Sequence, residues 1–166
     1  MGQGMRKRWQ NSKAGYTLVE LLVVMAILGL LAAAVMPLGE TLLRSQKERE
    51  LRLALWEIRG AIDDYKKAVD RGWIKTTAGE NGYPPSLEAL AQGVADARPN
   101  ASGQSLYFLR RIPRDPFAPA QLSAEQTWAL RSYASPTNRP SAGSDVFDVA
   151  SISTDFALDG SKYREW

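Results

Sequence analysis

The longest hydrophobic pattern of the chain runs from residue 16 to about residue 72 and changes its character once. Over residues 16–38 nearly every position is apolar, as expected for a helix in lipid. Over residues 39–72 apolar residues recur at steps of three and four, which predicts an amphipathic helix with one buried face. That face consists of Leu51, Ala54, Leu55, Ile58, Ala61, Ile62, Tyr65 and Val69.

Residues 73–166 are rich in loop signals and carry shorter patterns. Ser86 is placed to cap a short helix over residues 87–92. Strand-like stretches over 127–133 and 146–152 flank a connector of Pro, Ser, Asn and Gly residues, which predicts a hairpin. A final short strand or extended tail is expected over 161–166. The chain is therefore predicted to have an α+β fold, with a long helix packed on a small antiparallel sheet.

Aromatic residues gather in the second half of the chain. We expect them to fill the thin core between the helix and the sheet. They are Trp128, Tyr133, Phe147, Tyr163 and Trp166.

A charged residue stands at the edge of the long apolar run. Glu20 precedes residues 21–38, and that run of about 18 residues is close to the length needed to cross the hydrocarbon layer. A carboxylate within a membrane helix costs about 2.5–3.5 kcal/mol at the centre, so Glu20 is a functional candidate. Gly29 and Pro37 interrupt the apolar run, and proline predicts a kink because it removes a helix hydrogen bond.

Composition narrows the classes of function. The chain has 166 residues, a formal charge of +3, and neither cysteine nor histidine. Disulfides and the Ser-His-Asp and Cys-His mechanisms are therefore excluded. The basic excess lies in Arg6, Lys7, Arg8 and Lys13, where it would keep the N-terminus cytoplasmic, so a nucleic-acid partner is not expected.

The N-terminal motif carries a resemblance to a known family. It reads Gly15-Tyr16-Thr17-Leu18-Val19-Glu20. With its basic leader and apolar tail, this motif resembles the class III signal of type IV pilins and type II secretion pseudopilins. The resemblance implies cleavage after Gly15, methylation of the new N-terminus at Tyr16, and a role for Glu20 in assembly. Removal of residues 1–15 would change the formal charge from +3 to −1, since four bases and no acid are lost.

The second half of the chain is similar to the major pseudopilin of type II secretion. Three phrases carry the similarity: Gly82-Tyr83-Pro84, Ile112-Pro113-Arg114-Asp115-Pro116-Phe117 and Phe147-Asp148-Val149-Ala150-Ser151. The only cofactor that the resemblance implies is calcium, with Asp155 and Asp159 as the nearest equivalents of the family's ligands. The family's glycine-rich loop is absent here, and Asp159-Gly160 is also a common turn pair.

The resemblance implies a structural subunit that is a substrate of prepilin peptidase and not itself an enzyme. It implies a single-pass protein of the bacterial inner membrane, with residues 1–15 cytoplasmic and the C-terminal domain periplasmic. Its partners would be further copies of itself, minor pseudopilins and the inner-membrane assembly platform. In that family, a glycine and a proline placed like Gly29 and Pro37 bound a stretch that loses helicity in the filament.

Three alternatives remain open from the sequence. The chain could be a type IV pilin or minor pilin for adhesion, motility or DNA uptake, with the same N-terminus and fold. It could be a single-pass membrane-anchored periplasmic binding or enzymatic domain. An ordinary secretory signal with cleavage after the alanines of residues 32–34 is a third, although Glu20 at the start of the apolar run argues against it.

Overall fold

The computed structural model describes residues 15–77 and 79–166, with the side chains of residues 34–38 left out. The described residues up to Glu40 belong to one compact unit, and those of Thr41–Trp166 form a second. The predicted long helix is confirmed as α1, Leu18–Asp70, a helix of 53 residues.

In the first unit, α1 exposes its apolar side chains. Leu18 is 75% exposed and Leu30 is 74% exposed, and the large apolar residues between them are also exposed. The helix continues through Gly29, whereas the side chain of Pro37 lies outside the described residues, so the predicted kink there stays a prediction.

No helix in the described part of the chain is both long enough and apolar enough to cross a membrane.

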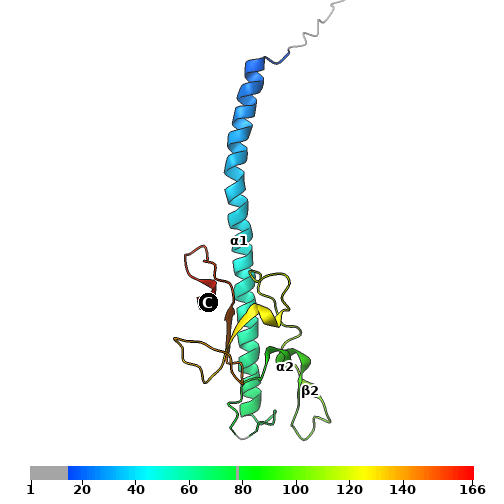
Figure 1. Ribbon diagram of the computed structural model, residues 1–166. Helices are drawn as coiled ribbons and strands as arrows, with labels where there is room; N and C mark the ends of the chain where they lie inside the picture. Colours follow the sequence, from blue (N-terminus) through cyan, green and yellow to red (C-terminus); the bar gives the residue numbers. More distant parts are fainter. Residues whose placement is uncertain (1–14, 78) are drawn as a thin grey trace, which may run out of the picture. The chain divides into compact units, whose positions relative to one another are not determined.

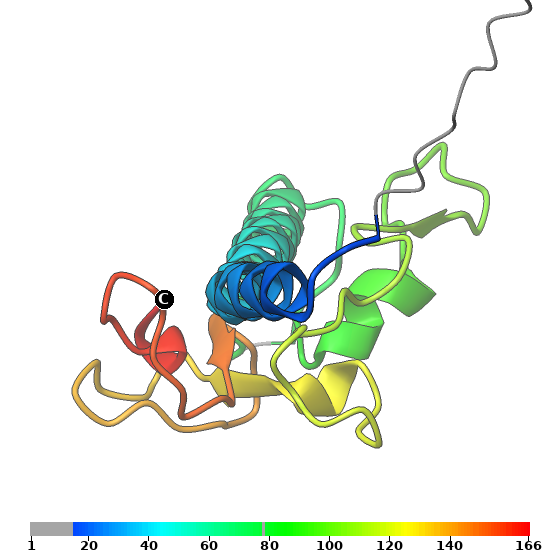
Figure 2. The same cartoon turned by 90° about the horizontal axis from the view of Figure 1, so that it is seen from above.

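The second unit is built around the C-terminal half of α1. Figures 1 and 2 show the hairpin of β3, Trp128–Arg131, and β4, Asp148–Ser151, beside one flank of this helix half, and α2, Leu87–Gln92, beside another. The predicted buried face is confirmed, since Leu51, Ile58 and Ile62 are each at most 1% exposed. They join a single core cluster with residues of α2, β3, β4 and the C-terminal segment.

The predicted short helix is α2, Leu87–Gln92. Ser86 lies at its N-cap, where the Oγ atom accepts a hydrogen bond of 3.3 Å from the backbone N–H of Ala89. This bond satisfies one of the free N–H groups of the first turn. Leu87 and Leu90 are buried, so α2 contributes one side to the core.

The predicted hairpin is confirmed as β3, Trp128–Arg131, paired antiparallel with β4, Asp148–Ser151. A short 3-10 helix, η1, Glu125–Thr127, leads into β3. A second antiparallel pair, β1, Val94–Ala95, with β2, Ser105–Leu106, was not predicted. Strands of two residues are too short to show a hydrophobic alternation, which explains the omission.

Two details of the C-terminal half differ from expectation. The short strand or extended tail predicted over 161–166 is instead an isolated bridge between Phe156 and Lys162 followed by a 3-10 helix, η2, Tyr163–Glu165. The 3-10 turn directs Tyr163 into the core, where its ring is fully buried. Tyr133 was predicted in the core but is 57% exposed, and its ring stacks on that of Tyr83.

Candidate processing and assembly site

The predicted cleavage site lies where the chain enters α1. Gly15, Tyr16 and Thr17 precede the helix, which begins at Leu18. Tyr16 is 77% exposed. None of the described atoms lies within 4 Å of a Cβ built on Gly15. Packing within the described chain therefore does not require glycine at this position.

The start of α1 is fixed by a side-chain cap. The Oγ1 atom of Thr17 accepts a hydrogen bond of 3.2 Å from the backbone N–H of Glu20, and the Thr17 carbonyl accepts one of 3.1 Å from Leu21. Threonine followed three residues later by glutamate is the capping-box sequence. This signal is visible in Thr17-Leu18-Val19-Glu20, but the cap was not predicted.

The cap places Glu20 in the first turn of α1, where the structure leaves it exposed. A carboxylate is stabilised at this end of a helix because the unpaired N–H groups carry partial positive charge. The cap also keeps the bond between Gly15 and Tyr16 outside the helix. One short sequence thus begins the helix, exposes the Glu20 carboxylate and leaves the preceding peptide bond outside the helix.

The calcium ligands implied by the resemblance lie in the C-terminal loop of the second unit. Asp155 and Asp159 are both exposed, and Asp159 lies 3.9 Å from Arg52 of α1. Among the side chains that the structure describes, no group of three or more acidic residues could hold a metal ion. The calcium expectation therefore has no ligand cluster to support it.

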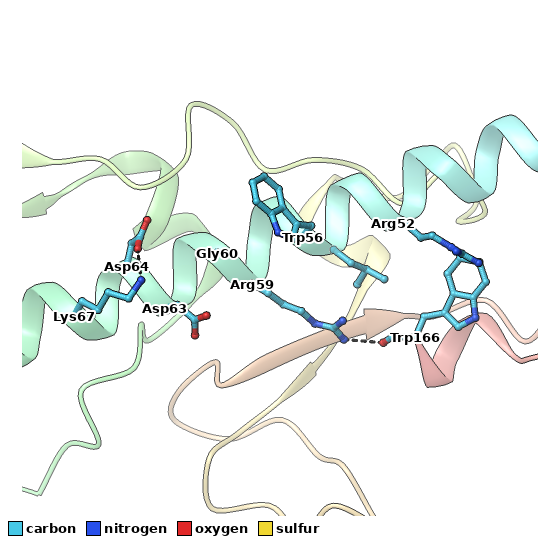
Figure 3. A pocket seen from close by; sticks show the side chains of 9 residues that line it. Arg52, Trp56, Arg59, Gly60, Asp63, Asp64, Lys67 and Trp166 are labelled. Carbon is cyan, nitrogen blue, oxygen red and sulfur yellow. Dashed lines mark hydrogen bonds and ion pairs between the residues drawn. The ribbon is translucent and has the colours of Figure 1, made fainter.

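A groove runs along the exposed side of α1 in the second unit, with a volume of about 710 Å³. Figure 3 shows Trp56 on one side of it and Trp166 at one end, where Arg59 donates to the Trp166 main-chain oxygen at 2.7 Å. Lys67 and Asp64 pair at 2.9 Å at the other end. Trp56 is 79% exposed, so its ring contributes little to the core.

Arginines on one side of α1 hold the C-terminal segment, a role that was not predicted for them. Arg44, Arg52 and Arg59 are spaced eight and seven residues apart, which places them along one side of the helix. Their spacing is visible in the sequence. Their partners are not, since they lie about a hundred residues further along the chain.

Comparisons with known proteins identify a motif at the N-terminus and relatives of the chain. The prokaryotic N-terminal methylation motif matches residues 10–36, which include Gly15, Tyr16 and Glu20. The chain is 33% identical over 116 residues to type II secretion system core protein G of Aeromonas hydrophila, covering 68% of this chain and 71% of that protein. It is 32% identical over 110 residues to core protein G of Vibrio cholerae serotype O1, covering 64% and 67%. No solved structure matches.

The sequence motif, the capped helix start and these relatives all fit the same family of proteins. The α+β architecture, with a long N-terminal helix and small antiparallel sheets, is that of a pilin-like protein. The chain belongs to the family of type II secretion system core protein G, the major pseudopilins.

Proposed function

We propose that this chain is the structural subunit of a type II secretion pseudopilus. It is cleaved after Gly15 by prepilin peptidase, methylated at Tyr16, and assembled into a filament through residues 16 to about 50. The growing filament drives export of folded proteins, and the chain performs no catalysis. The methylation motif over residues 10–36 is the observation that carries this proposal.

The geometry of the helix start supports cleavage and explains the need for a partner. A new amino group at Tyr16 stands one residue before the Thr17 cap, at the positive end of the helix dipole. A positive charge is unfavourable there. A carboxylate from a neighbouring subunit would offset it, and Glu20 is the acidic residue in the first turn of α1.

Pairing between subunits also sets their register. Burial of an ammonium or a carboxylate in an apolar bundle costs several kcal/mol unless the two charges meet. A subunit shifted along the filament would bury both charges unpaired. The pair of Tyr16 amine and Glu20 therefore selects one axial register more than it adds stability.

The apolar surface of the first unit supports an anchored and then assembled chain. Leu18, Leu22 and Leu30 are each more than 60% exposed. A continuous apolar surface of this kind is covered in the working protein by lipid or by other chains. We propose the inner membrane before assembly, with the second unit in the periplasm, and neighbouring subunits afterwards. The assembly platform and minor pseudopilins would be the further partners.

The test compares two acidic residues of α1. Glu20→Ala is expected to abolish filament assembly while membrane insertion and cleavage after Gly15 remain. Glu57→Ala is the matched control and should leave assembly unchanged, since Glu57 is also an exposed glutamate of α1 but lies beyond the residues proposed for assembly. Filaments are counted by shearing and electron microscopy after overproduction, and membrane insertion is followed by fractionation.

Normal filaments from Glu20→Ala would overturn the proposed register mechanism. An uncleaved, membrane-bound chain with no filaments in any variant would favour the membrane-anchored periplasmic domain instead. A surface fibre that serves adhesion, motility or DNA uptake would favour a type IV pilin.

A further inference from the structure

The C-terminal loop of the second unit is bound to α1 through positively charged side chains. Arg44 donates hydrogen bonds to Phe156 and Tyr163, and Arg52 forms an ion pair with Asp159. Arg59 donates to Asp148 at 2.8 Å and to the main-chain oxygens of Val149 and Trp166 at 2.9 and 2.7 Å.

The first anchor is centred on Tyr163. Arg44 Nε donates to the Tyr163 hydroxyl at 3.2 Å, and the same guanidinium donates to the main-chain oxygen of Phe156. Glu48, which is only 8% exposed, accepts from the Tyr163 hydroxyl at 3.0 Å and from the backbone N–H of Leu158 at 2.7 Å. A cation, a carboxylate and a buried phenol thus fix residues 156–163 against the helix.

The second anchor is centred on Asp159. Its Oδ1 atom accepts from the Ser161 backbone N–H at 2.9 Å and from the Ser161 hydroxyl at 2.6 Å. These hydrogen bonds, and the charge of Arg52 at 3.9 Å, hold the pKa of Asp159 below its ordinary value. Trp166 donates to Ser161 Oγ at 2.7 Å and lies under the Arg52 guanidinium at 4.3 Å.

These contacts use the groups that a calcium ion would need. Calcium takes six to eight oxygen ligands from carboxylates and carbonyls. Here the Phe156 carbonyl already accepts from Arg44, and Asp159 already accepts from Ser161 and faces Arg52. Asp155 lies close enough to Arg44 to raise the pKa of that guanidinium, after the larger effect of the bond to Tyr163. The two guanidinium charges beside the loop offset the charges of Asp155 and Asp159, which weakens the attraction of the loop for a divalent cation.

We propose that Arg44 and Arg52 take the place of a bound calcium ion and that the C-terminal loop of this chain folds without metal. The loop is held in place by the positively charged side chains of Arg44 and Arg52 of α1. These charges are permanent because arginine stays protonated. Stability of the second unit is then independent of calcium supply in the periplasm. The proposal stands apart from filament assembly, so each can fail without the other.

The experiment measures thermal unfolding of the full-length protein in detergent micelles, with excess calcium chloride and with the chelator EGTA. The melting temperature of the unaltered protein is expected to be the same in both. Arg44→Gln is expected to lower it by about 4 °C or more in both conditions, as loss of charge-assisted hydrogen bonds predicts. Arg49→Gln is the matched control, because Arg49 is exposed on the same helix and bonds only to Ser45 one turn away among described contacts. It is expected to change little.

A saturable rise of the melting temperature with calcium in the unaltered protein would overturn the proposal. Equal effects of Arg44→Gln and Arg49→Gln would also overturn it. If Arg44→Gln does not fold, Arg44→Lys and radioactive calcium binding to the unaltered protein decide the matter. A stoichiometric bound calcium ion would refute the proposal, and none bound, with a lowered melting temperature for Arg44→Lys, would support it.

Discussion

Two neighbouring positions of α1 give the sharpest test of how the second unit is held together. Ile58 is 0% exposed in the core, whereas Trp56, two residues away, is 79% exposed on the groove. Both are replaced by alanine, one at a time. The tryptophan substitution removes the larger side chain, so a simple count of lost atoms predicts the larger effect there. The structure predicts the opposite order.

The magnitude follows from burial. Truncation of a buried isoleucine to alanine costs about 2–5 kcal/mol through lost transfer energy and the cavity that remains. Substitution at an exposed site away from special contacts changes stability by about 0.5 kcal/mol or less. At about 4 °C per kcal/mol, Ile58→Ala should lower the melting temperature by about 8–20 °C. Trp56→Ala should shift it by about 2 °C or less.

The assay is chemical and thermal unfolding of the full-length chain in detergent. Near-ultraviolet circular dichroism reports the tertiary packing of the second unit, and guanidinium titration gives the free energy of unfolding. Equal losses for the two variants, or a larger loss for Trp56→Ala, would refute the assignment of the core face of α1.

Three further predictions concern the second unit. Asp115→Ala should lower the free energy of unfolding by about 1–3 kcal/mol, because it leaves the Ser151 hydroxyl and the Phe117 N–H without their acceptor in a buried site. Urea unfolding measures this loss, and Asp64→Ala, which breaks an exposed ion pair, should lower the free energy of unfolding less. Gly82→Ala should lower the free energy of unfolding by about 1–2 kcal/mol, since Gly82 has φ +77° and a Cβ there would lie 3.0 Å from Val69 Cγ1. Gly60→Ala, on the open surface of α1, should instead stabilise the protein in the same urea titration. Burial raises the pKa of Tyr163, and burial likewise raises those of Tyr65 and Tyr83. The folded chain therefore holds these protons more tightly than the unfolded chain, so stability is complete below about pH 10 and falls as pH rises through the folded pKa values. Urea titrations over this range should show a weaker decline for Tyr163→Phe, and an unchanged decline would contradict the assignment.

The helix and its buried face were predictable because the signal is local. Leu51, Leu55, Ile58 and Ile62 repeat with the period of a helix, and the structure buries all four. The short helix after Ser86 was equally predictable, since a cap acts within three residues. The motif from Gly15 to Glu20 indicated the family for the same reason, because its six residues are consecutive in the chain.

Contacts between distant segments could not be predicted. Arg44 and Tyr163 are separated by 119 positions, and no periodicity links them. Asp155 and Asp159 were matched to calcium ligands through the family resemblance, whereas the sequence did not show that Arg44 and Arg52 of α1 lie beside this loop. Trp128 was expected in the core and is there, while Tyr133, which lies beyond the end of β3 at Arg131, is exposed.

The central claim is tested most directly by the N-terminus of the protein made with and without prepilin peptidase. Intact-mass and N-terminal analysis of membrane-extracted protein should show a peptidase-dependent chain that begins at N-methylated Tyr16. A chain that keeps residues 1–15 in the presence of the peptidase would contradict the account, and so would one cut after residues 32–34.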